Sequence, residues 1–317
     1  GFYVASQSFC NYPKTAPSLA ATLNMFHLAQ MKKNGKPFYP SEKELYDLLD
    51  NNRAGGFLKI HGYKLIHLGS WWGPTHSSEQ ADANYFYKPL DTNYNEFLRM
   101  LLGNSLLKPV ISDLSEKGTA LELADIPAVH KRNLNYQFDK LFDIVEIPGP
   151  KYVFAHFLFP HEPYVFAADC QKLEEFGKAG VISREGYLNH LQCANKKIKG
   201  LVEHILVESD QPPVIVLAAD EGSFAHKEFG GVPDAHDWEK LSKEALLSHL
   251  GILNAFYFPG IKKVDVLYSE ITPVNTFRLI FDLYFGTDYK LLDDNIYVFD
   301  KKGIYYDFID VTKKVRN

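Results

Sequence analysis

The sequence contains few cysteines and no long apolar run, and each shortage excludes a class of protein. Three cysteines in 317 residues, none in a C-x-x-C pair, cannot form the dense disulfide framework of small secreted domains. No stretch reaches the roughly 18 to 20 apolar residues that a membrane-spanning helix needs. We expect Cys10, Cys170 and Cys193 to act as small apolar residues, with a Cys170–Cys193 bridge left open for an oxidising compartment.

An excess of positive charge is also missing. The chain has 34 Lys and Arg against 39 Asp and Glu, and its formal net charge is −5. Its paired lysines are scattered along the sequence and are typical of a solvated surface. Binding to a nucleic-acid backbone needs clustered positive side chains with little opposing acid. The composition therefore predicts that nucleic acid is not a partner.

Common catalytic motifs are absent as well. The sequence has no G-x-S-x-G elbow, no G-x-x-x-x-G-K-[ST] loop, no H-E-x-x-H pair and no G-x-G-x-x-G fingerprint. These absences disfavour serine esterases, P-loop enzymes, zincins and dinucleotide-dependent enzymes.

What the sequence does have is a regular alternation of short apolar runs and helical patterns. Strands that alternate with helices predict an α/β fold with a mostly parallel central sheet and helices on both faces. We expect one α/β domain over residues 1–286 and a small C-terminal subregion over 287–317. The apolar runs cover residues 2–5, 63–68, 152–159, 214–219 and 253–258, and the helical patterns cover 18–31, 42–49, 133–142, 184–207, 238–250 and 273–284.

A threonine between two prolines precedes the first helical pattern, in the segment NYPKTAPSL. Thr15 at this place is ordinarily a helix cap, whose oxygen accepts a backbone N–H of the first turn. The same helix start offers free N–H groups and the positive end of the helix dipole, which together bind phosphate or sulfate. Thr15 could therefore lie beside a bound anion, and it would become a nucleophile only if a metal ion or a base lowered the pKa of its hydroxyl.

Two adjacent carboxylates, Asp220 and Glu221, follow the apolar run 214–219 in the segment PPVIVLAADEG. Two such groups at the end of a buried strand are costly to bring together unless a cation or hydrogen bonds compensate. A divalent metal ion is the simplest compensation, because hard cations take oxygen ligands. In the alternative, Asp220 caps a turn and Glu221 faces water.

The segment KYVFAHFLFPHEPYVF places one histidine inside an apolar run and another in the loop that follows. We expect His156 to be a hydrogen-bonded core histidine. His161 follows Pro160 where a ligand crevice would open, and it could donate to a phosphoryl or sulfuryl oxygen or protonate a leaving group. A plain turn histidine is the alternative. Four further histidines near predicted strand ends stay open as site residues: His67, His76, His226 and His236.

Read in order, five segments resemble the sulfatase-like branch of the alkaline phosphatase superfamily. They are GFYVASQSFCNYPKTAPSLAATLNM, KYVFAHFLFPHEPYVF, PPVIVLAADEG, GILNAFYFPG and TPVNTFRLIFDLYFG. The resemblance covers the chain from residue 1 to about residue 292, and the order and spacing of the segments carry it. Membrane-tethered members of this branch include the lipoteichoic acid synthases and the phosphoethanolamine transferases.

The resemblance implies metal-dependent transfer or hydrolysis at a phosphate or sulfate ester. In that family a threonine at a helix start is both nucleophile and metal ligand, which corresponds to Thr15. The metal-binding pair corresponds to Asp220 and Glu221, and the histidine that contacts the substrate phosphate corresponds to His161. The implied reaction has two steps, in which the hydroxyl takes the group and then releases it to water or to an acceptor alcohol. The implied partner is a phosphate or sulfate ester, lipid- or glycan-linked, outside the cytoplasm of a bacterium.

Two departures from the family pattern change these expectations. The family has Asp-His-Gly where this chain has Asp220, Glu221 and Gly222, which we assign to a subgroup of the branch. A carboxylate in place of an imidazole shifts the preferred ion from Zn toward Mn, Mg or Ca. The family's first strand, which ends in an acidic metal ligand, should precede GFYV. We therefore expect a longer native protein that carries this strand and a membrane tether.

Two rival interpretations follow from the same residues. In the first, the chain is a catalytically silent sulfatase-like domain that acts as a binding or scaffold module. In the second, Thr15 only binds the anion and a metal-bound water attacks the ester.

Overall fold

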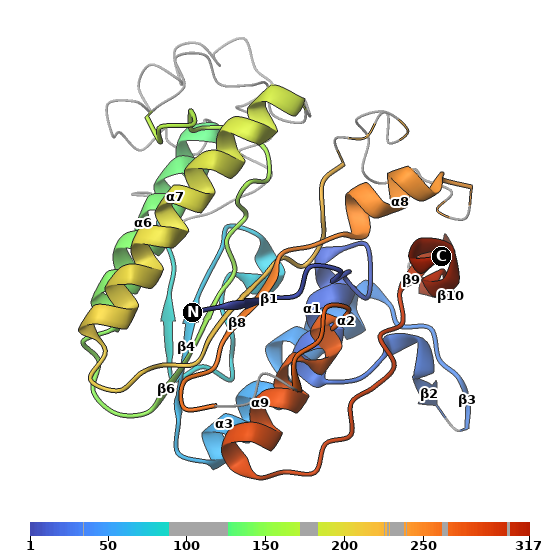
Figure 1. Cartoon of the computed structure of the whole chain (residues 1–317), viewed down its shortest axis with the longest axis horizontal. Coiled ribbons are helices and arrows are strands. Elements are labelled where there is room, and N and C mark those ends of the chain that lie inside the picture. Colours follow the sequence, from blue (N-terminus) through green and yellow to red (C-terminus); the bar gives the residue numbers. More distant parts are fainter. Residues whose placement is uncertain are drawn as a thin grey trace. The chain divides into compact units, whose positions relative to one another are not determined.

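The computed structural model describes residues 1–33, 35–88, 126–171, 183–224, 226, 228, 238, 240–261, 266–302 and 305–317 (Figure 1). These residues form two compact units. The terminal unit comprises Gly1–Tyr63 and Asp210–Asn317, and the central unit comprises Lys64–Ser209.

The terminal unit contains a three-stranded sheet in the order β1-β8-β7. Its strands are β1 (Tyr3–Val4), β7 (Ile215–Ala218) and β8 (Asn254–Tyr257). The middle strand, β8, is antiparallel to both neighbours, and Figure 1 shows β1 and β8 side by side. All three strands lie within apolar runs of the sequence, which predicted their positions. Strand direction does not follow from an apolar run, so the reversed β8 is a difference from the mostly parallel sheet that we expected.

Helices of the terminal unit start at recognisable polar residues. The Ser41 hydroxyl accepts the Glu44 N–H, and the Glu44 carboxylate accepts the Ser41 N–H, which is a complete capping box for α2. The Asn52 side chain accepts the Gly55 N–H at 2.8 Å and caps α3. The helical elements are α1 (Thr15–Asn24), η1 (Leu28–Gln30), α2 (Glu42–Asp50), α3 (Arg53–Ile60), α8 (Lys243–Leu250), η6 (Pro273–Asn275), α9 (Thr276–Phe285) and α10 (Thr312–Arg316).

Two short antiparallel hairpins complete the terminal unit. One pairs β2 (Lys32–Lys33) with β3 (Lys36–Pro37), and the other pairs β9 (Tyr297–Lys302) with β10 (Tyr305–Asp310). The second hairpin lies in the C-terminal subregion that the sequence set apart, and β9 is packed against the loop before α1. The domain boundary at residue 286 stays a prediction.

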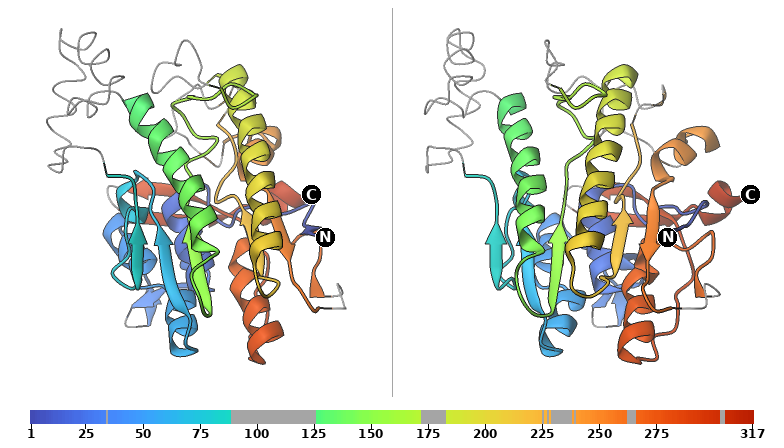
Figure 2. Two further views of the ribbon diagram at one scale, coloured as in Figure 1. Left: turned by 90° about the vertical axis from the view of Figure 1, so that its left-hand side faces the viewer. Right: turned by 60° about the vertical axis from the view of Figure 1, so that its left-hand side comes forward.

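The central unit contains a parallel sheet in the order β5-β4-β6. Its strands are β4 (Lys64–Leu68), β5 (Ala83–Tyr85) and β6 (Lys151–Ala155), and η2 (Gly73–Thr75) lies between β4 and β5. Two long helices, α6 (Ile126–Ile144) and α7 (Arg184–Glu208), lie side by side near this sheet (Figure 2). Their apolar side chains form one core cluster with β4, and its buried members are Ile66, Leu68, Phe138, Leu141, Ile144 and Leu201. No helix in the described parts of the chain is long and apolar enough to cross a membrane.

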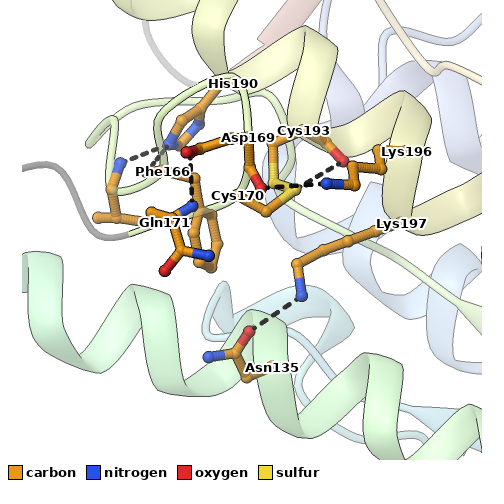
Figure 3. Close-up of a disulfide and its surroundings, with 10 residues drawn as sticks. Asn135, Phe166, Asp169, Cys170, Gln171, His190, Cys193, Lys196 and Lys197 are labelled. Atoms are coloured by element: carbon orange, nitrogen blue, oxygen red, sulfur yellow. Dashed lines mark hydrogen bonds between the residues drawn. A yellow bond between two sulfur atoms is a disulfide. The ribbon is translucent and has the colours of Figure 1, made fainter.

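A disulfide joins Cys170 to Cys193 in the central unit (Figure 3). The bridge connects the loop after β6 to α7, with the two Cα atoms 5.0 Å apart. Nearby, the Lys196 ammonium of α7 donates to the Asp169 carbonyl of the same loop at 3.3 Å. Cys10 is a free, buried thiol. Of the two roles that the sequence left open for Cys170 and Cys193, the structure has the bridge.

Candidate functional site

Thr15 is the first residue of α1, so it lies one position inside the helix start rather than at the cap. The cap is Lys14, which makes no side-chain capping hydrogen bond. Pro17 in the first turn has no N–H, and the Ser18 N–H is already bonded to the Lys14 carbonyl at 3.0 Å. The N–H groups of Thr15 and Ala16 therefore point out of the helix start, which is the arrangement that binds an anion.

The loop before Thr15 is held in place by buried polar groups. The Asn11 amide donates to the Thr272 hydroxyl at 3.0 Å and to the Asn295 carbonyl at 2.8 Å, while its oxygen accepts the Val274 N–H at 3.0 Å. The buried Tyr12 ring packs against aromatic residues of the C-terminal hairpin. These contacts give the segments NYPKT and TPVNTF a common structural role, because each satisfies polar groups of the other and fixes the approach to Thr15.

Asp220 and Glu221 follow the carboxyl end of β7, as the sequence predicted. Pairing with the chain before β8 extends one residue beyond β7, because the Ala219 N–H donates to the Leu253 carbonyl at 2.9 Å. The chain then turns at Gly222, whose N–H donates to the His249 carbonyl at 2.6 Å. Both carboxylate side chains are half-buried. The turn therefore fixes the two carboxylates against the C-terminal end of α8.

A buried histidine connects this turn to the loop before Thr15. The Nε2 atom of His249, on α8, lies 2.9 Å from the Pro13 carbonyl oxygen and 3.5 Å from the Glu221 Oε2 atom. The His249 side chain is fully buried. Thr15 lies two residues after Pro13, and Asp220 lies directly before Glu221. Three of the four residues predicted for the site thus belong to segments that meet at one imidazole ring.

Burial and the two carboxylates act together on the Cys10 thiol. Burial raises the pKa of the Cys10 thiol well above its ordinary value, and the charges of Glu221 and Asp220 raise this pKa further. The thiol is therefore protonated and unreactive as a nucleophile at neutral pH.

The donor set suits a divalent cation in its chemistry but is incomplete. Asp220 and Glu221 are hard oxygen donors, which suit Mg, Mn or Ca. Within the described residues, no group of three or more His, Cys, Asp and Glu side chains is placed to hold a metal ion. The two carboxylates would therefore need further ligands, for which the Thr15 hydroxyl is the candidate that the sequence predicts.

Gly222 has no room for a side chain, so a substitution there should lower the stability of the fold. A Cβ atom at this position would lie 2.6 Å from the His249 carbonyl oxygen and 2.8 Å from those of Ser248 and Gly251. We expect Gly222→Ala to lower the free energy of unfolding by about 1–3 kcal/mol, because backbone atoms must move to relieve the overlap. Urea unfolding followed by circular dichroism measures this difference.

Gly200→Ala is the matched control for Gly222→Ala. Gly200 lies inside α7, and a Cβ atom there would meet nothing within 4 Å. Alanine in a helix interior is more favourable than glycine by roughly 0.5–1 kcal/mol, so this variant should be more stable than the parent. A Gly222→Ala variant as stable as the Gly200→Ala variant would contradict the close packing at the turn.

His161 lies in the central unit, in the loop after β6, and its side chain is exposed. Its Nδ1 atom is 2.6 Å from the Glu162 carbonyl oxygen and 3.4 Å from the Glu162 Oε2 atom. Both neighbours are acceptors, so Nδ1 carries a proton. The Nε2 atom then accepts a hydrogen bond when the ring is neutral and donates one only when the ring is protonated. Contact with an anionic oxygen thus requires the imidazolium form of His161.

The loop that carries His161 is anchored to α7 by a second histidine. The buried His190 Nε2 atom accepts the Phe166 N–H at 3.0 Å and also the Val165 N–H, so this ring is a neutral acceptor. Burial lowers the pKa of His190 to about 4, and the nearby charge of His161 contributes to the lowering. The Cys170–Cys193 disulfide fixes the same loop one helical turn further along α7.

The remaining histidines of the predicted set have structural contacts. His156 is buried and its Nδ1 atom lies 2.8 Å from the Thr75 hydroxyl, which confirms the expectation of a hydrogen-bonded core residue. The His67 Nε2 atom lies 3.0 Å from the Thr75 carbonyl oxygen, and the His76 Nδ1 atom lies 2.9 Å from the Ser70 carbonyl oxygen. His226 accepts the N–H of Glu228, at the surface. His236 lies outside the described residues.

Comparison with family profiles and with curated proteins finds no match for this chain. Solved structures do match. The C-terminal periplasmic domain of EcEptC from Escherichia coli has a TM-score of 0.56 at 13% sequence identity, over 98% of this chain and 81% of that domain. A structure of the same domain in complex with Zn also has a TM-score of 0.56 at 13% identity, over 93% of this chain and 78% of that one. The chain shares its fold with the EcEptC domain. This likeness confirms the predicted α/β fold.

Within this EcEptC-like fold, His249 is a residue of the candidate site that was not predicted from the sequence. A signal was present, because Ala245, Leu246, His249 and Leu250 follow the helical spacing of a buried face in α8. A histidine on that face indicates a buried polar contact. Nothing in the sequence says that the partners of this contact would be Pro13 and Glu221, which lie 236 and 28 positions away along the chain.

Proposed function

We propose that this chain is the catalytic part of a metal-dependent enzyme that hydrolyses or transfers a phosphate or sulfate ester. The observation that carries the proposal is the meeting of two segments at His249: the loop before Thr15 and the turn with Asp220 and Glu221. It supports a single site that combines an anion-binding helix start, a hydroxyl and two carboxylates. The fold shared with a domain that has been solved in complex with Zn supports a divalent cation in that site.

In the proposed reaction, Thr15 is the nucleophile. Its Oγ atom forms a bond to phosphorus or sulfur while the bond from that atom to the ester oxygen breaks, and the departing alkoxide takes up the proton that the threonine loses. Water or an acceptor alcohol then displaces Thr15 from the group. The N–H groups of Thr15 and Ala16 bind the anionic oxygens, and His161 keeps the substrate-contact role that the family resemblance implies. A bound divalent cation supplies positive charge that lowers the pKa of the threonine hydroxyl and stabilises the transition state.

We place the enzyme outside the cytoplasm of a bacterium. The Cys170–Cys193 disulfide supports this location, because disulfides persist in oxidising compartments. The shared fold with a periplasmic domain supports it as well. A lipid- or glycan-linked ester and a membrane tether in the native protein belong to the same proposal.

Turnover of chromogenic esters tests the proposal. The purified chain, stripped with EDTA, is assayed on p-nitrophenyl phosphate, bis-p-nitrophenyl phosphate and p-nitrophenyl sulfate, with Mn²⁺, Zn²⁺, Mg²⁺ or Ca²⁺ added back. We expect one ester class to be turned over and only when a metal ion is present. No turnover with any pair of ester and metal, in this chain and in a chain extended at its N-terminus, would contradict the proposal and favour a silent binding module.

A further inference from the structure

A single ring nitrogen of His249 faces two acceptors from separate parts of the chain. Nε2 lies 2.9 Å from the Pro13 carbonyl oxygen and 3.5 Å from Glu221 Oε2. A carbonyl oxygen can only accept, so Nε2 carries a proton and donates to the Pro13 carbonyl. The Glu221 carboxylate lies beside the same N–H, at a distance longer than a hydrogen bond.

Two aromatic rings pack against the His249 ring. The His249 ring lies over the Phe224 ring, with centroids 3.9 Å apart, and it contacts the Trp238 ring at 5.3 Å. The side chain is fully buried. A polar ring in such an aromatic slot costs free energy unless its hydrogen bonds are satisfied. Packing against Phe224 and Trp238 orients the plane of the His249 ring, and this orientation sets the direction in which Nε2 donates.

The backbone of the same residue fixes the turn that carries the carboxylates. The His249 carbonyl accepts the Gly222 N–H at 2.6 Å, and a side chain at Gly222 would overlap this carbonyl. His249 thus contacts the chain next to Asp220 through its main chain and Glu221 through its ring. It contacts the loop that leads to Thr15 through the same ring.

We propose that His249 is a positioning residue, which holds the Thr15 loop and the Asp220–Glu221 turn at a fixed separation for metal and ester binding. This inference rests on the proposed function. His249 itself touches neither substrate nor metal ion; its effect passes through Pro13 and Glu221. Groups that orient a metal ligand change metal affinity or activity by about 10- to 100-fold when they are removed.

Two substitutions separate hydrogen bonding by His249 from its packing. His249→Phe keeps an aromatic ring in the slot and removes the donor, whereas His249→Gln places an amide N–H near the position of Nε2. His61→Phe is the matched control, because His61 is an exposed residue of the same unit at the end of α3. Mn²⁺ affinity is measured by calorimetry on the full chain, and kcat and KM are measured separately on the best chromogenic ester.

We expect His249→Phe to weaken Mn²⁺ binding by about 10- to 100-fold and to lower kcat more than it raises KM. His249→Gln should recover most of the Mn²⁺ affinity, and His61→Phe should match the parent. The inference is overturned if the parent binds no Mn²⁺, if His249→Phe binds it as tightly as the parent, or if the Gln variant is as impaired as the Phe variant. If Mn²⁺ affinity depends on His249 as expected but no ester is turned over, the inference stands and the proposed function fails.

Discussion

Replacing Thr15 with alanine is expected to abolish ester turnover and to leave the fold intact. Loss of a nucleophile costs enzymes roughly a thousandfold or more in kcat, because binding groups alone cannot replace the covalent step. The fold should survive because Lys14, not Thr15, occupies the cap position of α1. Within the described residues the Thr15 side chain makes no hydrogen bond that the substitution would remove. Steady-state kinetics and thermal unfolding, measured on the same protein, test both parts of the prediction.

Thr22→Ala is the control for Thr15→Ala. Thr22 lies two turns further along α1, and its hydroxyl donates to the Ser18 carbonyl at 2.8 Å. This variant removes a threonine hydroxyl from the same helix, away from its N-terminus, and kcat should not change. Thr15→Ser keeps a hydroxyl and should retain turnover, since a primary alcohol can perform the same attack.

The size of the Thr15→Ala effect also discriminates between mechanisms. If a metal-bound water attacks and Thr15 only binds the anion, the variant loses one hydrogen bond to a charged group, which is worth about 1.5–3 kcal/mol. The loss in kcat/KM would then be about ten- to hundredfold and would appear largely in KM. A loss of that size would indicate that a metal-bound water, and not Thr15, attacks the ester. Turnover equal to that of the parent would show that Thr15 has no role in the reaction.

Much of the fold could be predicted from the sequence because its local signals agree with one another. The pattern 184–207 became α7 (Arg184–Glu208), with the Ser183 hydroxyl accepting the Gly186 N–H as its cap. In contrast, α3 was missed, because two adjacent glycines in its first half obscure the helical pattern. The first helix starts three residues earlier than its pattern, since Pro17 is tolerated in the first turn although it interrupts the apolar spacing.

The candidate site could be predicted only in part, because its local signals do not show which segments meet. Strand ends identified Thr15 and the pair Asp220 and Glu221 as residues of interest. The imidazole that joins them is on α8, between apolar residues, and its acceptors are a main-chain carbonyl and a distant carboxylate. Every residue has a main-chain carbonyl, so the sequence does not show which one a buried side chain will contact. The exposed His161 belongs to the central unit, and its contact with the substrate stays a prediction from the sequence.

Removing one carboxylate charge from the turn after β7 should have the second large effect. Asp220→Asn is expected to weaken Mn²⁺ binding by about 100-fold or more, because even groups that only orient a ligand change affinity by about 10- to 100-fold. Ester turnover at low Mn²⁺ should fall in parallel and recover in part when Mn²⁺ is raised. Calorimetric titration and the Mn²⁺ dependence of kcat measure the two effects.

Asp210→Asn is the matched control for Asp220→Asn, since Asp210 is an exposed aspartate that precedes β7 and the substitution changes the net charge equally. Glu221→Gln adds a further distinction. A glutamine keeps the shape of the side chain and an oxygen beside His249, so this variant should keep the turn in place and lose metal affinity through the missing charge alone. In crystals soaked with Mn²⁺, the anomalous peak should lie about 2–2.6 Å from an Asp220 oxygen. A peak elsewhere, or equal Mn²⁺ affinity of the Asp210 and Asp220 variants, would show that the carboxylates after β7 do not bind the metal ion.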